Sequence, residues 1–327
     1  MSDSRTKFGI LLPTREVILS GRSNPNSIYD LADRAEALGF HSVWVGDSVV
    51  AKPRLDALTT LSAVGARTRR VRLGTAVYIA ALRNPVLVAH MVATIDWLSR
   101  GRVDLGIGYS RPKDPVQEHE YKILGHDPAK RIKMSEELVH IIRRLWREND
   151  VSFAGVFSSF EHVTVEPKPM QLGGVPIWLA SNNVEPGLKR VARLADGWLN
   201  NITDPKTYKE CLEKIRAYAA EAGRDPQTIE PGLYFTLAGG DESAIREGQT
   251  FLSQYYSRPY EVVAKAMVCV MGNWDQVMDR IQAYAEAGAR SLVLRFATSD
   301  QMRHLETCAE ELWRRGFMSS ARNGGTP

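Results

Sequence analysis

The chain has 327 residues, of which 44% are hydrophobic and 24% charged, and its 42 basic and 38 acidic side chains leave a net charge of +4. This composition fits a globular protein with a large core, built as one α/β barrel or as two smaller domains. The basic residues are spread along the chain, and the densest cluster holds only four arginines between Arg67 and Arg72. We therefore expect no nucleic-acid partner.

The sequence carries no signal for export or for a membrane. Its N-terminus, MSDSRTKFGILLP, lacks a charged segment followed by a long apolar run, and polar residues interrupt the most apolar stretch of the chain. We expect a cytoplasmic protein without a membrane partner. Cys211, Cys269 and Cys308 are far apart and form no CxxC pair, so we expect neither a disulfide framework nor a metal site.

Strand and helix patterns alternate along the chain. Short apolar runs predict strands at 7–13, 41–48, 71–77, 102–108, 176–181, 195–201, 231–239 and 290–296. Helical patterns lie at 28–39, 53–68, 85–100, 131–149, 185–194, 204–223, 274–289 and 301–316. Residues 151–169 alternate weakly and predict an inserted hairpin. Residues 109–129 show no period and predict a long connection, of the kind that is often functional in compact domains.

The clearest unit is the strand, helix and strand between Arg69 and Tyr109. Its helix begins at a proline and ends before a glycine. The apolar residues expected to face a parallel sheet are Val88, Val92, Ile95 and Leu98.

The two strands of this unit contain glycine at positions 74, 106 and 108. Glycine inside a strand indicates that a ligand or another backbone segment approaches closely. We therefore expect something to lie against these strand ends.

Eight predicted strands alternate with helices, and no linker rich in Pro, Gly or Ser divides them. This order predicts a single (β/α)8 TIM barrel over residues 1–318, with the inserted connection and hairpin, followed by a flexible tail at 319–327. In such a barrel, residues at the carboxyl ends of the strands form the site. That rule selects Pro13, Thr14, Asp47, Ser48, Thr75, Ala76, Val77, Tyr109, Ser110, Ser181, Asn182, Asn183, Asn200, Asn201 and Arg295.

Two short motifs suggest other functions but are incomplete. GIGYSR at 106–111 has two glycines of a dinucleotide fingerprint and an arginine in place of the third. VWVGDS resembles the GDS block of a serine hydrolase family, in which an Asp and a His three residues apart complete the triad. Here Asp300 and His304 are four apart. A serine without a positioned base is inert, so a hydrolase remains a weak alternative.

One family resemblance covers nearly the whole chain. LGTAV, RNPVLVAHMVATIDWLSRGR and LGIG in the central unit, and then RIKMSEELVHIIRRLW, PIWLAS, ARLADGWLN and AYAEAGARSLVLRF, occur in the order typical of the luciferase-like monooxygenase superfamily. The chain resembles that superfamily. The resemblance implies a TIM barrel that binds reduced FMN or the deazaflavin coenzyme F420 at the carboxyl ends of its strands, and an enzyme that often forms homodimers.

The resemblance also implies roles for particular residues. Thr75 and Ala76 match the place where the family's third strand bulges under the cofactor ring, sometimes with a non-prolyl cis peptide, and Asp47 matches a polar residue close to the ring. Tyr109 and Ser110 match positions beside the cofactor tail. The segment formed by Ser181, Asn182 and Asn183 precedes a helix whose amides could hold phosphate. The alternatives are a hydrogen-bonded loop anchor for Asp47 and helix capping for the Ser181–Asn183 segment.

The choice of cofactor depends on one position. Deazaflavin-dependent members commonly place a histidine directly after this aspartate, whereas this chain has Ser48. The sequence therefore favours a monooxygenase that uses reduced FMN and dioxygen on a small organic substrate in a site shielded from water, with a separate reductase to supply the flavin. An F420-dependent hydride-transfer enzyme and a flavin-binding protein without turnover are the alternatives. The catalytic residue is not assigned, and its candidates are Asp47, Ser48, His119 and Tyr121.

Overall fold

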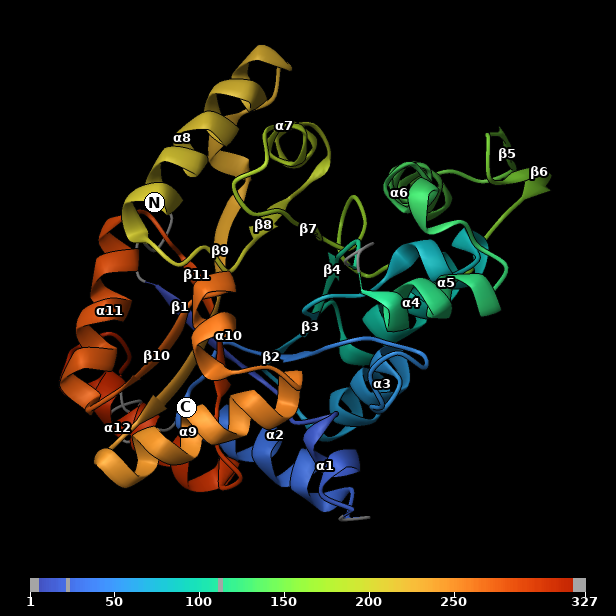
Figure 1. Cartoon of the computed structure of the whole chain (residues 1–327). Coiled ribbons are helices and arrows are strands. Elements are labelled where there is room, and N and C mark those ends of the chain that lie inside the picture. The colour runs from blue at the N-terminus through green and yellow to red at the C-terminus, as the bar shows by residue number, and fades with distance from the viewer. Residues whose placement is uncertain (1–5, 22–23, 111–113, 320–327) are drawn as a thin grey trace, which may run out of the picture. The chain divides into compact units, whose positions relative to one another are not determined.

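A computed structural model of the protein describes residues 6–21, 24–110 and 114–319. The chain folds as a (β/α)8 TIM barrel, as the alternation of strands and helices predicts (Figure 1). The parallel barrel strands pair in the order β9-β11-β1-β2-β3-β4-β7-β8, and β8 pairs with β9 to close the sheet. These strands are β1 (Lys7–Leu11), β2 (Ser42–Val45), β3 (Arg72–Thr75), β4 (Val103–Ile107), β7 (Ile177–Ala180), β8 (Gly197–Leu199), β9 (Glu230–Gly239) and β11 (Ser291–Phe296).

Several helices begin where an Asp or Asn side chain caps the first turn and a proline follows it. Asn84 accepts hydrogen bonds from the N–H groups of the first turn of α4, and Asp204 accepts one at the start of α8. The helices are α1 (Glu16–Leu19), α2 (Asn26–Leu38), α3 (Ala57–Arg67), α4 (Pro85–Ser99), α5 (Pro115–Ile123), α6 (Arg131–Arg147), α7 (Glu185–Leu194), α8 (Pro205–Glu221), α9 (Glu242–Tyr256), α10 (Tyr260–Ala266), α11 (Trp274–Glu286) and α12 (Gln301–Arg314). Short 3-10 turns are η1 (Ala80–Leu82), η2 (Pro128–Lys130) and η3 (Pro226–Thr228).

The chain contains two compact units, which are described separately. The first unit consists of the described parts of residues 1–13, 26–44 and 181–327, and the second consists of those of residues 14–25 and 45–180. That the chain forms a single domain over residues 1–318 stays a prediction. Most of the predicted tail, residues 320–327, lies outside the described residues.

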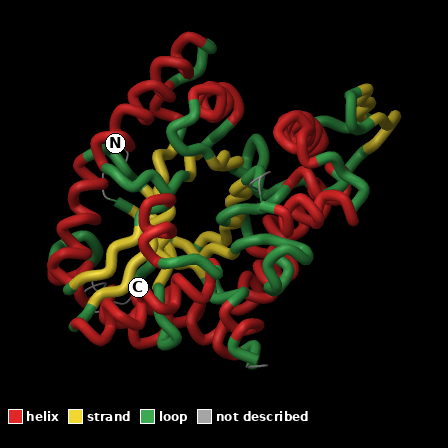
Figure 2. The backbone as a smooth tube through the Cα atoms, in the orientation of Figure 1, coloured by secondary structure: helices red, strands yellow, loops and turns green. Residues whose placement is uncertain are grey.

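In the first unit, the sequence shows no element between β9 and α11, whereas the structure has three. Helices α9 and α10 follow β9, and β10 (Cys269–Gly272) then pairs in parallel with the end of the long strand β9 (Figure 2). The missing pattern has a physical cause, because α9 buries only Gly248, Leu252 and Tyr255 and its remaining residues are mostly polar.

In the second unit, the glycines of β4 accommodate another part of the chain. A Cβ atom at Gly106 would lie 2.0 Å from the carbonyl oxygen of Thr75, and one at Gly108 would lie 2.1 Å from Cγ2 of Val77. Gly106 and Gly108 are therefore explained by the close approach of Thr75, at the end of β3, and of Val77, which follows it. Close approach of another backbone segment is one of the two causes expected from the sequence. The inserted hairpin is also present, with antiparallel strands β5 (Val151–Ala154) and β6 (Ser159–Val163) (Figure 1).

Two sequence-based expectations in this unit are wrong. Residues 109–129 are not a connection without structure, because they contain α5, which buries Gln117, Glu120 and Tyr121. In α4, Val88, Val92 and Ile95 are buried as expected, but Leu98 is 61% exposed. Asp96 is fully buried instead, because its carboxylate accepts hydrogen bonds from the backbone and side-chain amides of Gln171.

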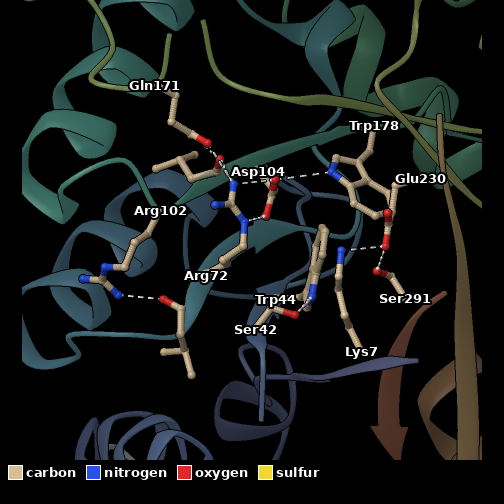
Figure 3. Close-up of polar contacts among 12 residues, drawn as sticks. Lys7, Ser42, Trp44, Arg72, Arg102, Asp104, Gln171, Trp178, Glu230 and Ser291 are labelled. Atoms are coloured by element: carbon tan, nitrogen blue, oxygen red, sulfur yellow. Dashed lines mark hydrogen bonds and ion pairs between the residues drawn. The ribbon is translucent and has the colours of Figure 1, made fainter. Parts of the chain in front are cut away.

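Buried polar contacts surround β3 and β4 in the second unit. Arg72 forms two hydrogen bonds with the carboxylate of Asp104, at 2.6 and 2.8 Å, and a third with the side chain of Gln171 (Figure 3). The guanidinium of Arg102 donates to the backbone carbonyls of Gly65 and Val71. Arg102, the last residue of the segment RNPVLVAHMVATIDWLSRGR, therefore has a structural role.

No helix in the described residues is both long and apolar enough to cross a membrane.

Candidate functional site

Asp47 follows β2 and is held by two contacts within the second unit. Arg83 Nη2 donates to Oδ1 at 2.7 Å, and the backbone N–H of Ile79 donates to Oδ2 at 2.9 Å. Only 1% of the Asp47 side chain and 14% of the Arg83 side chain are exposed. These are the contacts of a hydrogen-bonded anchor, and they place a buried ion pair directly after β2.

Burial has the largest effect on the pKa of Asp47. It raises the pKa of Asp47 above its ordinary value, although the nearby Arg83 acts in the opposite direction. The Arg83 guanidinium also lies 4.6 Å from the centre of the Tyr78 ring, in a cation–π contact. Burial raises the pKa of Tyr78 as well, so this phenol stays protonated at neutral pH.

The residues after β3 leave the regular strand geometry. The peptide bond between Ala76 and Val77 is cis, which is the feature that the family resemblance implied for this segment. The hydroxyl of Thr75 donates to the carbonyl of Gly106 at 2.8 Å and accepts from the N–H of Gly106 at 2.9 Å. Because this hydroxyl bridges β3 to β4, a contact between Thr75 and a cofactor would have to involve mainly its backbone.

Ser48 is buried, and both of its hydrogen bonds given below have a structural role. Its hydroxyl donates to Oε1 of Glu120 at 2.8 Å and accepts from the N–H of Lys52 at 2.9 Å. A hydroxyl that donates to a carboxylate and lacks a histidine partner in these contacts is not an activated nucleophile. His304 lies beside Trp274 and Phe296 in the first unit, so the structure gives no support to a serine hydrolase triad.

Tyr109 and Ser110 follow β4 and are contacted by α5. Tyr121 is 1% exposed, and its phenol accepts from Ser110 Oγ at 3.3 Å and donates to the carbonyl of Tyr109 at 3.5 Å. Burial raises the pKa of Tyr121, and its hydrogen bond with Ser110 opposes this shift. His119, the other candidate on this helix, lies on its exposed side.

Ser181, Asn182 and Asn183 belong to the first unit, between β7 and α7. They do not cap α7, because its cap position is Val184 and no side chain bonds there, so the capping alternative is wrong. The Ser181 hydroxyl donates to the carbonyl of Asn182. A Cβ atom at Gly187, in the first turn of α7, would lie 2.1 Å from the Ser181 hydroxyl oxygen. Ser181 therefore lies against the first turn of α7, where the phosphate site was predicted.

Asn182 and Asn201 fix each other in the same unit. The side-chain amide of Asn182 donates to Oδ1 of Asn201 at 2.7 Å, and its carbonyl oxygen accepts from the N–H of Asn201 at 3.1 Å. These contacts bring the segments after β7 and β8 together, as the strand-end rule predicts.

Arg54 is a cation in the second unit that sequence reasoning missed. Its guanidinium lies against Gly46, where a Cβ atom would be only 2.1 Å from Nη1. Among the described residues, the hydrogen bond shown for this guanidinium is a long one, at 3.3 Å, to the carbonyl of Lys52. Its remaining N–H groups are donors that could hold the carbonyl oxygens of a cofactor ring, and the lack of a side chain at Gly46 leaves room for the guanidinium.

Comparison with known proteins assigns the family. A profile of the luciferase-like monooxygenase family matches residues 6–291. The chain belongs to this family. This luciferase-like protein also shares 30% identity over 313 residues with an F420-dependent glucose-6-phosphate dehydrogenase from Kineococcus radiotolerans, a match that covers 86% of the chain and 90% of that relative.

Solved structures share the fold of this luciferase-like protein. A monooxygenase from Streptomyces bottropensis superposes with a TM-score of 0.77 at 24% identity, over 95% of this chain and 99% of that one. An F420-dependent secondary alcohol dehydrogenase, solved with an F420-acetone adduct, superposes with a TM-score of 0.78 at 21% identity, over 94% and 98%. Oxygenating and deazaflavin-dependent enzymes thus share this barrel. The luciferase-like protein is an oxidoreductase by family.

Arg83 and Glu120 are the other residues that sequence reasoning missed. Arg83 precedes the Asn-Pro cap of α4, which marks it as the end of the connection after β3. Glu120 lies on α5, and the Asp114-Pro115 pair at the start of that helix was the signal that could have revealed it.

Proposed function

We propose that this luciferase-like protein is a coenzyme F420-dependent oxidoreductase that transfers a hydride between the deazaflavin and a small organic substrate. The observation that carries the proposal is the match to an F420-dependent dehydrogenase over 86% of this chain and 90% of that relative. A match of this extent covers most of a barrel in which several strand ends together build the site.

Ser48 does not favour FMN in the structure. Position 48 could select the cofactor only if its side chain faced the cofactor or the substrate. Ser48 is only 6% exposed, and its hydroxyl is engaged by Glu120 and by the N–H of Lys52. The absence of histidine there therefore does not discriminate between the two cofactors.

The residues of the second unit fit a deazaflavin ring. Arg54 has N–H donors that could serve ring carbonyl oxygens, and Asp47 is held in place by Arg83. When bound, a deazaflavin carries two electrons and a proton as one unit and reacts poorly with dioxygen.

The chain's own groups would position the ligand and hold charge. Arg83 neutralises Asp47, so a ring placed near them would meet a fixed dipole instead of a bare carboxylate. That the start of α7 near Ser181, in the first unit, binds a phosphate of the cofactor tail stays a prediction. A homodimer and, for FMN, a separate reductase remain predictions.

A paired titration tests the choice of cofactor. Purified protein is titrated anaerobically with F420 and with FMN, each oxidised and reduced, while cofactor fluorescence or absorbance is followed. We expect F420 to bind at least about tenfold more tightly, a difference of about 1.4 kcal/mol. Arg54→Gln should weaken that binding, whereas Arg69→Gln, on the connection before β3, should not. Tighter binding of reduced FMN than of either form of F420 would overturn the proposal.

A further inference from the structure

The buried carboxylate of Glu120 organises the segment that follows Asp47. Glu120 is fully buried, and its Oε1 accepts from the Ser48 hydroxyl at 2.8 Å and from the backbone N–H groups of Val49, Val50 and Ala51 at 2.6, 2.7 and 3.1 Å. Its Oε2 is also buried and has no hydrogen-bond partner in the part of the chain that the structure describes. All four donors therefore converge on a single oxygen.

Through these hydrogen bonds, Glu120 fixes the backbone of residues 49–51. Successive N–H groups that point at one centre form a concave anion site, and here the occupant is a side chain of the same chain. Without the carboxylate, three backbone N–H groups and one hydroxyl would lose their shared acceptor, so the loop would have to open to water.

Tyr121, the next residue on α5, contacts two other segments, those after β3 and β4. The phenol of Tyr121 contacts Ser110 Oγ and the carbonyl of Tyr109, which follow β4. Its ring packs in one buried cluster with Ile79, Ala81 and Leu82, which follow β3.

Two of the three segments that α5 contacts, those after β2 and β3, meet at Asp47. Glu120 fixes the residues directly after Asp47, and the cluster around Tyr121 contains Ile79, whose N–H donates to the Asp47 carboxylate. Adjacent residues of one helix therefore fix the segments after β2, β3 and β4, on which the second unit's predicted cofactor residues lie.

We propose that Glu120 and Tyr121 are positioning residues that hold these three segments in place for the cofactor without contacting it. The proposal rests on the proposed function only for the identity of the ligand. Its structural part concerns the amides of residues 49–51 and can be measured without any ligand.

The experiment compares Glu120→Ala and Glu120→Gln with wild type. Glutamine keeps an acceptor oxygen at the Oε1 position, whereas alanine removes it. Glu118→Ala is the matched control, since Glu118 lies on the same helix and pairs only with Lys122 among the described ion pairs, on the surface. Amide hydrogen exchange at Val49, Val50 and Ala51 is measured without ligand, and affinities for F420 and FMN are measured by titration.

We expect exchange at these amides to be more than about tenfold faster in Glu120→Ala, and cofactor affinity to fall by at least about tenfold. Glu120→Gln and Glu118→Ala should stay within about threefold of wild type in both measurements. Unchanged exchange in Glu120→Ala would overturn the proposal, and so would faster exchange with unchanged affinity, because the contact would then be structural only.

Three further outcomes also decide the two proposals. If Glu120→Ala does not fold, Tyr121→Phe replaces it. Loss of the phenol should speed exchange at Tyr109 and Ser110 and weaken cofactor binding, and no change in either would overturn the proposal. If wild type binds FMN but not F420, the proposed function fails while the positioning proposal is tested with FMN. If wild type binds neither cofactor, both fail.

Discussion

Replacing Arg83 by methionine should destabilise the protein by about 3 kcal/mol at neutral pH. Removing one partner of a buried ion pair typically costs about 3–5 kcal/mol, because the other charge is left without compensation. The lower end applies here, since 14% of the Arg83 side chain is exposed and the N–H of Ile79 still donates to Asp47. The variant also loses the cation–π contact with Tyr78.

The pH dependence identifies the mechanism. Burial raises the pKa of Asp47 and Arg83 lowers it, so the pKa should rise further in Arg83→Met. The folded variant then takes up a proton at a higher pH than its unfolded chain does. The unfolding free energy of the variant should therefore increase, relative to wild type, as the pH falls from neutrality through the Asp47 pKa.

Urea unfolding of Asp47→Asn, Arg83→Met and the double variant provides the assay. The double variant should be more stable than the sum of the single changes predicts, by at least about 1 kcal/mol, because its second substitution removes a charge that the first left unpaired. Additive effects, or a destabilisation that does not depend on pH, would show that the two side chains do not form a compensating pair.

Three further predictions concern other parts of the chain. Ser181→Asp should weaken cofactor binding by at least about tenfold, because a carboxylate at the start of α7 would repel a phosphate; unchanged affinity in a titration of the folded variant would move the phosphate site elsewhere. Gly106→Ala should destabilise the protein by about 1–3 kcal/mol in urea unfolding, since its Cβ would lie 2.0 Å from the Thr75 carbonyl oxygen; wild-type stability would contradict that packing. Burial lowers the pKa of His304 from 6.5, so the unfolded chain binds a proton more readily and the unfolding free energy should fall as the pH drops below about 6.5. His304→Phe should reduce this slope, and an unchanged slope would exclude His304 as its source.

The barrel could be predicted because its signals are local. Apolar runs of strand length alternate with helical periods, and Asn84-Pro85 and Asp204-Pro205 announce two helix starts. The helix α5 escaped prediction because the face that it buries carries Gln117, Glu120 and Tyr121, which produce no apolar period. For a related reason, Leu98 is exposed and Asp96 is buried, the opposite of what their polarity predicts. Hydrogen bonds from Gln171 compensate the burial of the Asp96 carboxylate.

The approximate location of some candidate site residues could be predicted from their positions in the sequence. Asp47, Ala76 and Ser110 lie where strands end, so their approximate place follows from the barrel rule. The partners that fix them could not be inferred in this way. Arg83 lies 36 residues from Asp47, and Glu120 lies 72 residues from Ser48. Such pairings depend on the three-dimensional path of two connections, which no local pattern in a single sequence encodes.

The oxygen requirement of turnover tests the proposed function most directly. Oxidised F420 is incubated anaerobically with the protein and a panel of hydroxyl-bearing small molecules, and a parallel aerobic reaction uses reduced FMN with an oxygen electrode. The account predicts that F420 is reduced without dioxygen, in equal amount to the substrate oxidised, and that reduced FMN supports no substrate-dependent oxygen uptake. Substrate oxygenation that requires dioxygen and reduced FMN, with no reaction of F420, would contradict it.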